Sequence, residues 1–176
     1  AAVIGLGRYG MSLARELYQM GFDVLGIDKD ERVVQDLTGQ LTYVVRADST
    51  SESVLRELGV ANFDVAVVAI GTDIQASIMT TLLLKTLLVK EVVARSNNLL
   101  HAQTLERIGA DKVVYPEMES ARRAAHVGFD NGVVDYMPIV PNFGITKVHP
   151  PEAMFQHTLE EVGLGGGARH KYDIHV

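Results

Sequence analysis

Three glycines near the start of the chain have the spacing of a phosphate-binding turn. The run Gly5-Leu-Gly-Arg-Tyr-Gly10 lies between an apolar segment, residues 2–4, and a helical stretch from Ser12 to Met20. Gly5 allows a tight turn, Gly7 lets the backbone approach a pyrophosphate, and Gly10 lets the helix pack close to the strand. The N–H groups at the start of such a helix attract an anion. The pattern predicts a dinucleotide site.

Arg8 is a cation in the first turn of the expected helix, where the helix dipole favours negative charge. Its presence is explained if an anion binds beside it. The alternative is an ordinary solvated arginine at the surface. The residue type alone leaves both interpretations open.

Asp28 stands 21 residues after Gly7, at the end of an expected strand over residues 22–27. In dinucleotide folds an acid at this place binds the ribose hydroxyls and disfavours a 2′-phosphate, so we expect NADP to be excluded. The alternative for Asp28 or Asp30 is to cap the helix from Glu31 to Leu37. We assign ribose recognition to Asp28 and capping to Asp30.

Short apolar runs alternate with amphipathic segments along the first two thirds of the chain. Residues 64–70 are apolar after the first, as in a strand buried on both faces of a parallel sheet. The alternation predicts an α/β fold, a Rossmann-like doubly wound parallel sheet of order 3-2-1-4-5-6 with a ligand crevice at the carboxyl ends of the strands. The other expected elements are strands at 2–4, 42–46, 91–95 and 112–115, and helices ending near 58 and at 74–89, 99–108 and 117–129.

Two capping signals and one unusually apolar helix refine this prediction. Ser49-x-x-Glu52 and Thr158-x-x-Glu161 have the spacing of capping boxes. The helix at 74–89 is apolar nearly all round, although a single stripe suffices to cover a sheet. The excess indicates a second buried surface such as a subunit contact. The alternative is a helix wedged inside a monomer.

The end of the chain has a different character. Turn residues indicate a linker or boundary at Pro138, Pro141, Asn142 and Gly144. A tail of roughly 40 residues cannot bury a core of its own. We therefore expect a nucleotide-binding domain at 1–138, and at 139–176 a linker and the truncated start of a small C-terminal α+β subdomain. In that tail we expect a strand at 145–148, a flexible loop at 163–167 and a strand at 172–176. The abrupt ends predict a fragment of a longer protein.

Composition excludes several classes of function. The 16 basic and 22 acidic residues give a net charge of −6, which argues against nucleic acid as a partner, because such partners need a basic face. The chain has no cysteine for a disulfide scaffold or a cysteine metal site. No apolar run reaches the ~18 residues that span a bilayer. We expect a soluble, cytosolic domain.

The expected binding site lacks the residues that turnover would require. A dehydrogenase needs a substrate domain or a proton-transfer group beside the nicotinamide. There is neither a Tyr-x-x-x-Lys pair nor a histidine at the end of a strand of the expected parallel sheet, and the histidines lack zinc-binding spacing. We therefore predict that the chain is not an enzyme. Two alternatives stay open: the cofactor domain of an NAD-dependent oxidoreductase, and an NADH-sensing redox repressor.

Several motifs occur in the order and at the spacing of one family. They are Ala2-Val-Ile-Gly-Leu-Gly-Arg-Tyr-Gly10, Asp28, Ala47-Asp-Ser-Thr50, Val67-Val-Ala-Ile-Gly71 with Ile74-Gln-Ala-Ser77, and Leu105-Glu-Arg-Ile-Gly-Ala-Asp111 before Tyr115-Pro-Glu117. With these motifs the chain resembles the RCK (TrkA-N, KTN) domain, in particular the Ktr-type cytosolic regulatory subunits of bacterial potassium uptake systems. The tail from residue 143 resembles the start of the RCK C-terminal subdomain.

The resemblance implies a nucleotide-sensing gating subunit. Such domains form homodimers, assemble into an octameric ring and dock on the inner face of the cell membrane through a potassium-translocating subunit. The nucleotide, ATP or ADP and in some members NAD(H), sets the shape of the ring. It can do so only by binding the states of the ring with different affinity.

The resemblance also implies roles for single residues. Arg8 and Arg95 would meet the phosphates, Asp28 the ribose, and Asp48-Ser49 the adenine side. Glu117 would bind a divalent or monovalent cation at the dimer contact, together with a symmetry-related partner or phosphate oxygens. The expected nucleotide-binding residues are Gly5, Leu6, Gly7, Arg8, Tyr9, Gly10, Asp28, Lys29, Ala47, Asp48, Ser49, Ala69, Ile70, Gly71 and Arg95. Many members have Gly-Asp-Ala-Thr where this chain has Ala47-Asp-Ser-Thr50, which leaves the base preference open.

Overall fold

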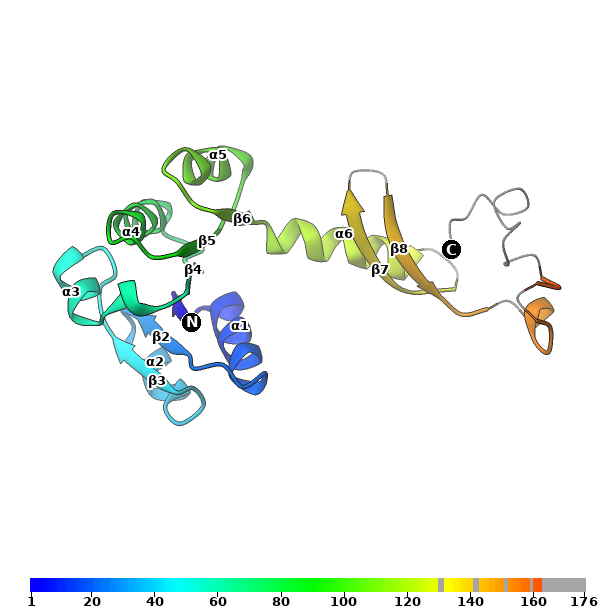
Figure 1. The fold of residues 1–176 in the computed structure, drawn as a ribbon, viewed down its shortest axis with the longest axis horizontal. Helices are drawn as coiled ribbons and strands as arrows, with labels where there is room; N and C mark the ends of the chain where they lie inside the picture. Colours follow the sequence, from blue (N-terminus) through cyan, green and yellow to red (C-terminus); the bar gives the residue numbers. More distant parts are fainter. Residues whose placement is uncertain (130–131, 141–142, 151, 159, 163–176) are drawn as a thin grey trace. The chain divides into compact units, whose positions relative to one another are not determined.

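The computed structural model describes residues 1–129, 132–140, 143–150, 152–158 and 160–162. The chain divides into two compact units, residues 1–118 and 119–176. The first unit holds a six-stranded parallel sheet of order β3-β2-β1-β4-β5-β6 (Figure 1). Its strands are β1 (Ala2–Ile4), β2 (Leu25–Asp28), β3 (Tyr43–Arg46), β4 (Val65–Val68), β5 (Glu91–Arg95) and β6 (Lys112–Val114). The predicted doubly wound α/β fold and its strand order are confirmed.

Helices connect consecutive strands of this sheet. They are α1 (Arg8–Gln19), α2 (Glu31–Leu37), α3 (Glu52–Glu57), α4 (Ile74–Thr86) and α5 (Leu99–Arg107), with a 3-10 turn η1 (Val60–Asn62) before β4. Helix α1 starts inside the glycine run, directly after Gly7, so that Arg8 lies in its first turn as predicted and the helix extends ahead of the helical stretch seen from Ser12. That placement brings the helix N-terminus to the end of β1.

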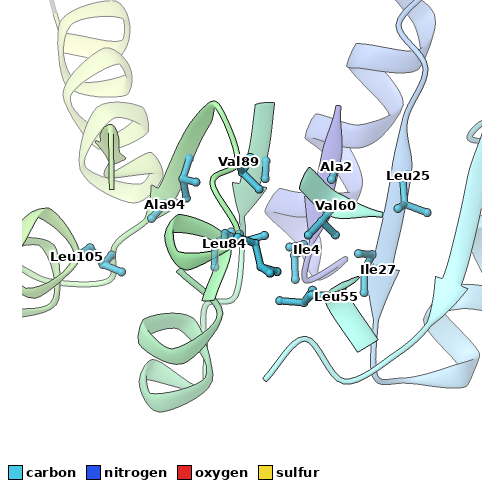
Figure 2. Close-up of a cluster of buried hydrophobic side chains, with 14 residues drawn as sticks. Ala2, Ile4, Leu25, Ile27, Leu55, Val60, Leu84, Val89, Ala94 and Leu105 are labelled. Atoms are coloured by element: carbon cyan, nitrogen blue, oxygen red, sulfur yellow. The ribbon is translucent and has the colours of Figure 1, made fainter. Parts of the chain in front are cut away.

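The central strands are buried on both faces of the sheet. Ile4 packs with Leu55 of α3 and Leu84 of α4 on one face (Figure 2). Its neighbour Val3 packs on the other face, in a cluster that includes Leu37 of α2. Burial on both faces explains why these strands are apolar without alternation. The core therefore lies on both faces of the sheet.

Capping residues set several helix boundaries. Asp30 caps α2 by accepting the N–H of Arg32 at 2.9 Å, as predicted. The capping box predicted at Ser49 is wrong, because α3 begins at Glu52 with Ser51 as the residue before it. The Ser49 hydroxyl instead points into the fold, where it is buried.

The second unit contains a single antiparallel hairpin among its described residues. Helix α6 (Pro116–Phe129) leads into it, followed by β7 (Val133–Val140), β8 (Phe143–Val148) and a 3-10 turn η2 (Glu152–Met154). Pro138 and Gly144 face each other across the hairpin, so the linker predicted at these residues is wrong. In a two-stranded sheet both strands are edges, and an edge strand tolerates proline.

Other predictions for this end of the chain have mixed outcomes. The capping box at 158–161 is confirmed, because the Thr158 N–H donates to Glu161 Oε2 at 2.8 Å and the Glu161 N–H donates to Thr158 Oγ1 at 3.3 Å. Pro141, Asn142, the loop at 163–167 and the strand at 172–176 lie outside the described residues. The division between residues 138 and 139 stays a prediction.

Candidate functional site

The glycine run forms a tight turn between β1 and α1. Gly5 has a φ of +88°, a backbone conformation that residues with a side chain rarely adopt. A Cβ on Gly10 would lie 1.9 Å from the Gly5 carbonyl oxygen, so only glycine lets α1 approach the strand this closely. A Cβ on Gly7, in contrast, would meet no atom within 4 Å. The protein's own packing requires glycine at 5 and 10, whereas Gly7 leaves space that a ligand can use.

The first turn of α1 offers an anion site beside this space. The residue before the helix, Gly7, provides no side-chain cap, and no acidic residue lies in the first turn. The first N–H groups of a helix lack partners within it and carry partial positive charge. Arg8 is exposed at this turn, whereas Leu6 is buried beneath it and Tyr9 is half-buried. The cation and the helix terminus therefore favour the same anionic ligand.

The carboxylate of Asp28 ties the end of β2 to the glycine turn. Its Oδ2 accepts the N–H of Leu6 at 2.6 Å, and its Oδ1 accepts the N–H of Asp30 at 2.9 Å. These bonds fix the direction of the side chain beside the turn. Each carboxylate oxygen has a second acceptor position, which suits the ribose hydroxyls predicted to bind there.

A cavity of about 340 Å³ lies where the ends of β2 and β3 meet. It is lined by Lys29, Arg46, Ala47 and Asp48. The hydroxyl and the N–H of Thr50 donate to Asp48 and hold the pKa of its carboxyl below the ordinary value, so the group is charged at neutral pH. The cavity therefore offers an acceptor and a planar cation to a nucleotide base.

Arg46 is a lining residue that the sequence analysis missed. It is the last residue of β3, and its Nε donates to the Lys29 carbonyl at 3.3 Å. Its position at the carboxyl end of a predicted strand was a signal that could have found it.

Ser49 lies at the same turn but is engaged inside the fold. Its hydroxyl and that of Thr80 in α4 are 2.8 Å apart in a buried hydrogen bond. The Thr80 hydroxyl also lies 3.3 Å from the Ser49 carbonyl oxygen. The side chain of Ser49 therefore joins the loop after β3 to α4, and the nucleotide contact predicted for this residue stays a prediction.

The residues at the carboxyl ends of β4 and β5 lie at the same edge of the sheet as the glycine turn. Ala69 is buried and Ile70 is half-buried. The backbone of Ile70 approaches Gly5 so closely that a Cβ on Gly5 would lie 3.0 Å from the backbone nitrogen of Ile70. The Arg95 guanidinium packs on Gly71, where a Cβ would lie 2.0 Å from Nη1. The Arg95 guanidinium carbon also lies 5.8 Å from the centre of the Tyr9 ring. These contacts bring the segments after β1, β4 and β5 to one edge of the sheet.

Glu117, in the first turn of α6, forms an ion pair with Nη2 of Arg95. Within the described residues no three His, Cys, Asp or Glu side chains gather as a metal site would require. A cation at Glu117 would thus need further ligands besides the described His, Cys, Asp and Glu side chains, and its binding there stays a prediction.

Helix α4 buries an unexpected face. Its buried residues are Ser77, Thr80, Thr81 and Leu84, while Ile74, Met79 and Leu82 are each about two fifths exposed. The apolar excess noted in the sequence therefore lies partly at the surface. None of the helices in the described part of the chain has the length and apolar character needed to cross a membrane.

The parallel sheet, its strand order and the glycine turn define a Rossmann-type α/β domain. The family model of the TrkA-N domain matches residues 1–116, and the chain belongs to this family. Over 175 residues it is 39% identical to Ktr system potassium uptake protein C of Bacillus subtilis, with 99% of this chain and 77% of that protein covered. Over 147 residues it is 40% identical to Ktr system potassium uptake protein A of the same organism, with 84% and 66% covered.

A solved structure shows the same fold. The NAD(P)-binding domain of an exopolyphosphatase-related protein from Archaeoglobus fulgidus is similar with a TM-score of 0.62 and 26% identity. The similarity covers 69% of this chain and 90% of that one. The resemblance to the TrkA-N family inferred from the motifs is confirmed.

Proposed function

We propose that this chain is the nucleotide-sensing regulatory domain of a potassium uptake system. The observation that carries the proposal is one edge of the sheet in a TrkA-N domain. At this edge the glycine turn leaves space beside Gly7, two hydrogen bonds fix the carboxylate of Asp28, and Arg8 and Arg95 lie beside the turn. The names of the relatives support the link to potassium uptake. Because those relatives are potassium uptake proteins, regulation without turnover accounts for the site better than an oxidoreductase does.

The nucleotide would lie across the turn with its phosphates on the first turn of α1. Asp28 would accept the ribose hydroxyls, and the cavity bordered by Arg46 and Asp48 would take the base. The ligand would be ATP or ADP, and Arg8, which is exposed beside the turn, would reach the γ-phosphate that only ATP carries. NAD(H) is the other ligand of suitable chemistry, and a cation near Glu117 would join the phosphates.

Regulation would proceed by a shift between conformations of an assembly. A ligand shifts such an equilibrium only if it binds the states with different affinity. The exposed apolar residues of α4 support burial against another copy, in homodimers that build an octameric ring. The ring would be cytoplasmic and would sit on the inner face of the membrane through a potassium-translocating partner. Residues 1–138 would bind the nucleotide and residues 139–176 would begin a second subdomain.

Calorimetric titration with ATP, ADP, NADH and NAD⁺ tests the nucleotide site. We expect saturable binding of at least one of them, weakened by Asp28→Ala and unaffected by Asp36→Ala, which removes an exposed acid from α2. Absence of binding by the unaltered protein would refute the proposal. Scattering profiles of the ATP-bound and ADP-bound assembly should differ, and identical profiles would contradict regulation through ring shape.

A further inference from the structure

Arg95 is the most enclosed cation at the edge of the sheet that holds the glycine turn. Its side chain is only 17% exposed, compared with 66% for Glu117. Among the described residues its Nε is buried and lacks a hydrogen-bond partner. The guanidinium lies between Gly71 and the Tyr9 ring in the first turn of α1. It is therefore held beside the turn expected to receive phosphate.

Glu117 already neutralises this guanidinium. One carboxylate oxygen pairs with Nη2, which leaves the buried Nε as a further donor. Pro116 begins α6, so Glu117 lies in the first turn of a helix, where the dipole also stabilises its charge. Two independent features thus keep an anion at the position where Arg95 would otherwise bind one.

We propose that Glu117 is an internal competitor that occupies Arg95 when no phosphate is bound and so lowers the affinity for nucleotide phosphates. The inference rests on the nucleotide site proposed above. A carboxylate and a phosphate present similar pairs of oxygens to a guanidinium. A phosphate that pairs with Arg95 through both Nε and Nη2 therefore displaces Glu117 from Nη2, and this displacement weakens nucleotide binding.

Three variants distinguish competition from a general effect of charge. Glu117→Gln keeps the size of the side chain but removes the anion. Glu119→Gln removes the same charge from an exposed neighbour on the same helix. The double variant with Glu117→Gln and Arg95→Gln also removes the cation for which the Glu117 carboxylate and the nucleotide phosphate are proposed to compete.

Titrations are made in EDTA, so that no divalent ion bridges carboxylate and phosphate, with ADP as the phosphate ligand and adenosine as the ligand without phosphate. We expect Glu117→Gln to bind ADP about fivefold more tightly than the unaltered protein, with unchanged affinity for adenosine. Glu119→Gln should change neither affinity by more than about twofold. In the Arg95→Gln background the gain from Glu117→Gln should vanish.

Each other outcome is decisive. Equal or weaker ADP binding by Glu117→Gln would overturn the competition while leaving the nucleotide site intact. The same gain in Glu119→Gln would show that net charge alone acts. If the unaltered protein bound neither ADP nor any other nucleotide, the proposed function would fail and the competition with it. Thermal unfolding of each variant checks that Glu117→Gln is folded, and Glu117→Asn serves as the second test if it is not.

Discussion

The Asp28 carboxylate accepts the backbone N–H of Leu6 at 2.6 Å, although the two residues belong to different strand–helix units. Because the same carboxylate also accepts the N–H of Asp30, it holds the end of β2 against the glycine turn. One side chain thus shapes the turn and points an acceptor at the expected ribose. Stability and binding should be coupled at this residue.

Replacement of Asp28 by alanine should therefore lower the free energy of unfolding by about 1–3 kcal/mol, because the part-buried Leu6 N–H loses its acceptor. Urea denaturation measures this change. Asp36→Ala, on the exposed side of α2, should alter stability by less than about 0.5 kcal/mol. Unchanged stability of Asp28→Ala would contradict a structural role for the bond.

Gly7 and Gly10 should respond to alanine in opposite ways. Gly10→Ala should destabilise the fold by at least about 2 kcal/mol, because its Cβ would lie 1.9 Å from the Gly5 carbonyl oxygen. Gly7→Ala should cost less than about 1 kcal/mol, because its Cβ meets open space and its φ is −64°. It should nevertheless weaken nucleotide binding. Denaturation and ADP titration of both variants separate the two roles, and normal ADP binding by Gly7→Ala would exclude a close approach of phosphate.

Arg8→Ala should weaken binding of ATP at least tenfold more than binding of ADP, because it removes the proposed contact with the γ-phosphate, which ADP lacks. Arg15→Ala, which removes the same charge farther along α1, serves as the control. Calorimetry with both nucleotides measures the ratio. Equal losses for ATP and ADP would remove the specific role of Arg8.

Ser49 and Thr80 should behave as a coupled pair. Ser49→Ala or Thr80→Val should each cost about 1–3 kcal/mol, because each leaves the other buried hydroxyl without its bond. The double variant should cost less than the sum by about 0.5–2 kcal/mol. Urea denaturation of the four proteins completes the cycle. Strict additivity would show that the hydroxyl pair contributes nothing specific.

Stability should fall as the pH decreases below about 6.5, the ordinary pKa of histidine. Burial lowers the pKa of His101, so the unfolded chain takes up a proton that the folded chain resists. The contribution is present above the unfolded pKa and is lost as the pH falls through the folded one. Replacement by glutamine should flatten the dependence of unfolding free energy on pH between 7 and 5, whereas replacement of the exposed His149 should leave it unchanged. Equal slopes for the original protein and His101→Gln would contradict this assignment.

Local patterns in the sequence predicted most of the fold. Apolar runs marked the strands, and the short connections with right-handed crossovers predicted the sheet order that the structure shows. The positions of Gly5, Gly10 and Asp28 followed from spacing, because turn geometry and strand ends depend on neighbours along the chain. The capping box predicted at Ser49 failed, because the hydroxyl bonds with Thr80 inside the fold instead. The linker predicted at Pro138 failed, because the residue lies in an edge strand, where proline is tolerated.

The sequence by itself determined the class of fold and the glycine turn, which follow from patterns of neighbouring residues, and the position of Asp28, which follows from its spacing to the glycines at the end of an expected strand. Only the tertiary structure decided that the Ser49 hydroxyl bonds with Thr80, that Arg46 borders a cavity and that Glu117 pairs with Arg95. These contacts join residues 17 or more positions apart or depend on the shape of a surface. Their physical origin is the packing of whole helices and strands, which no local pattern of residue types specifies.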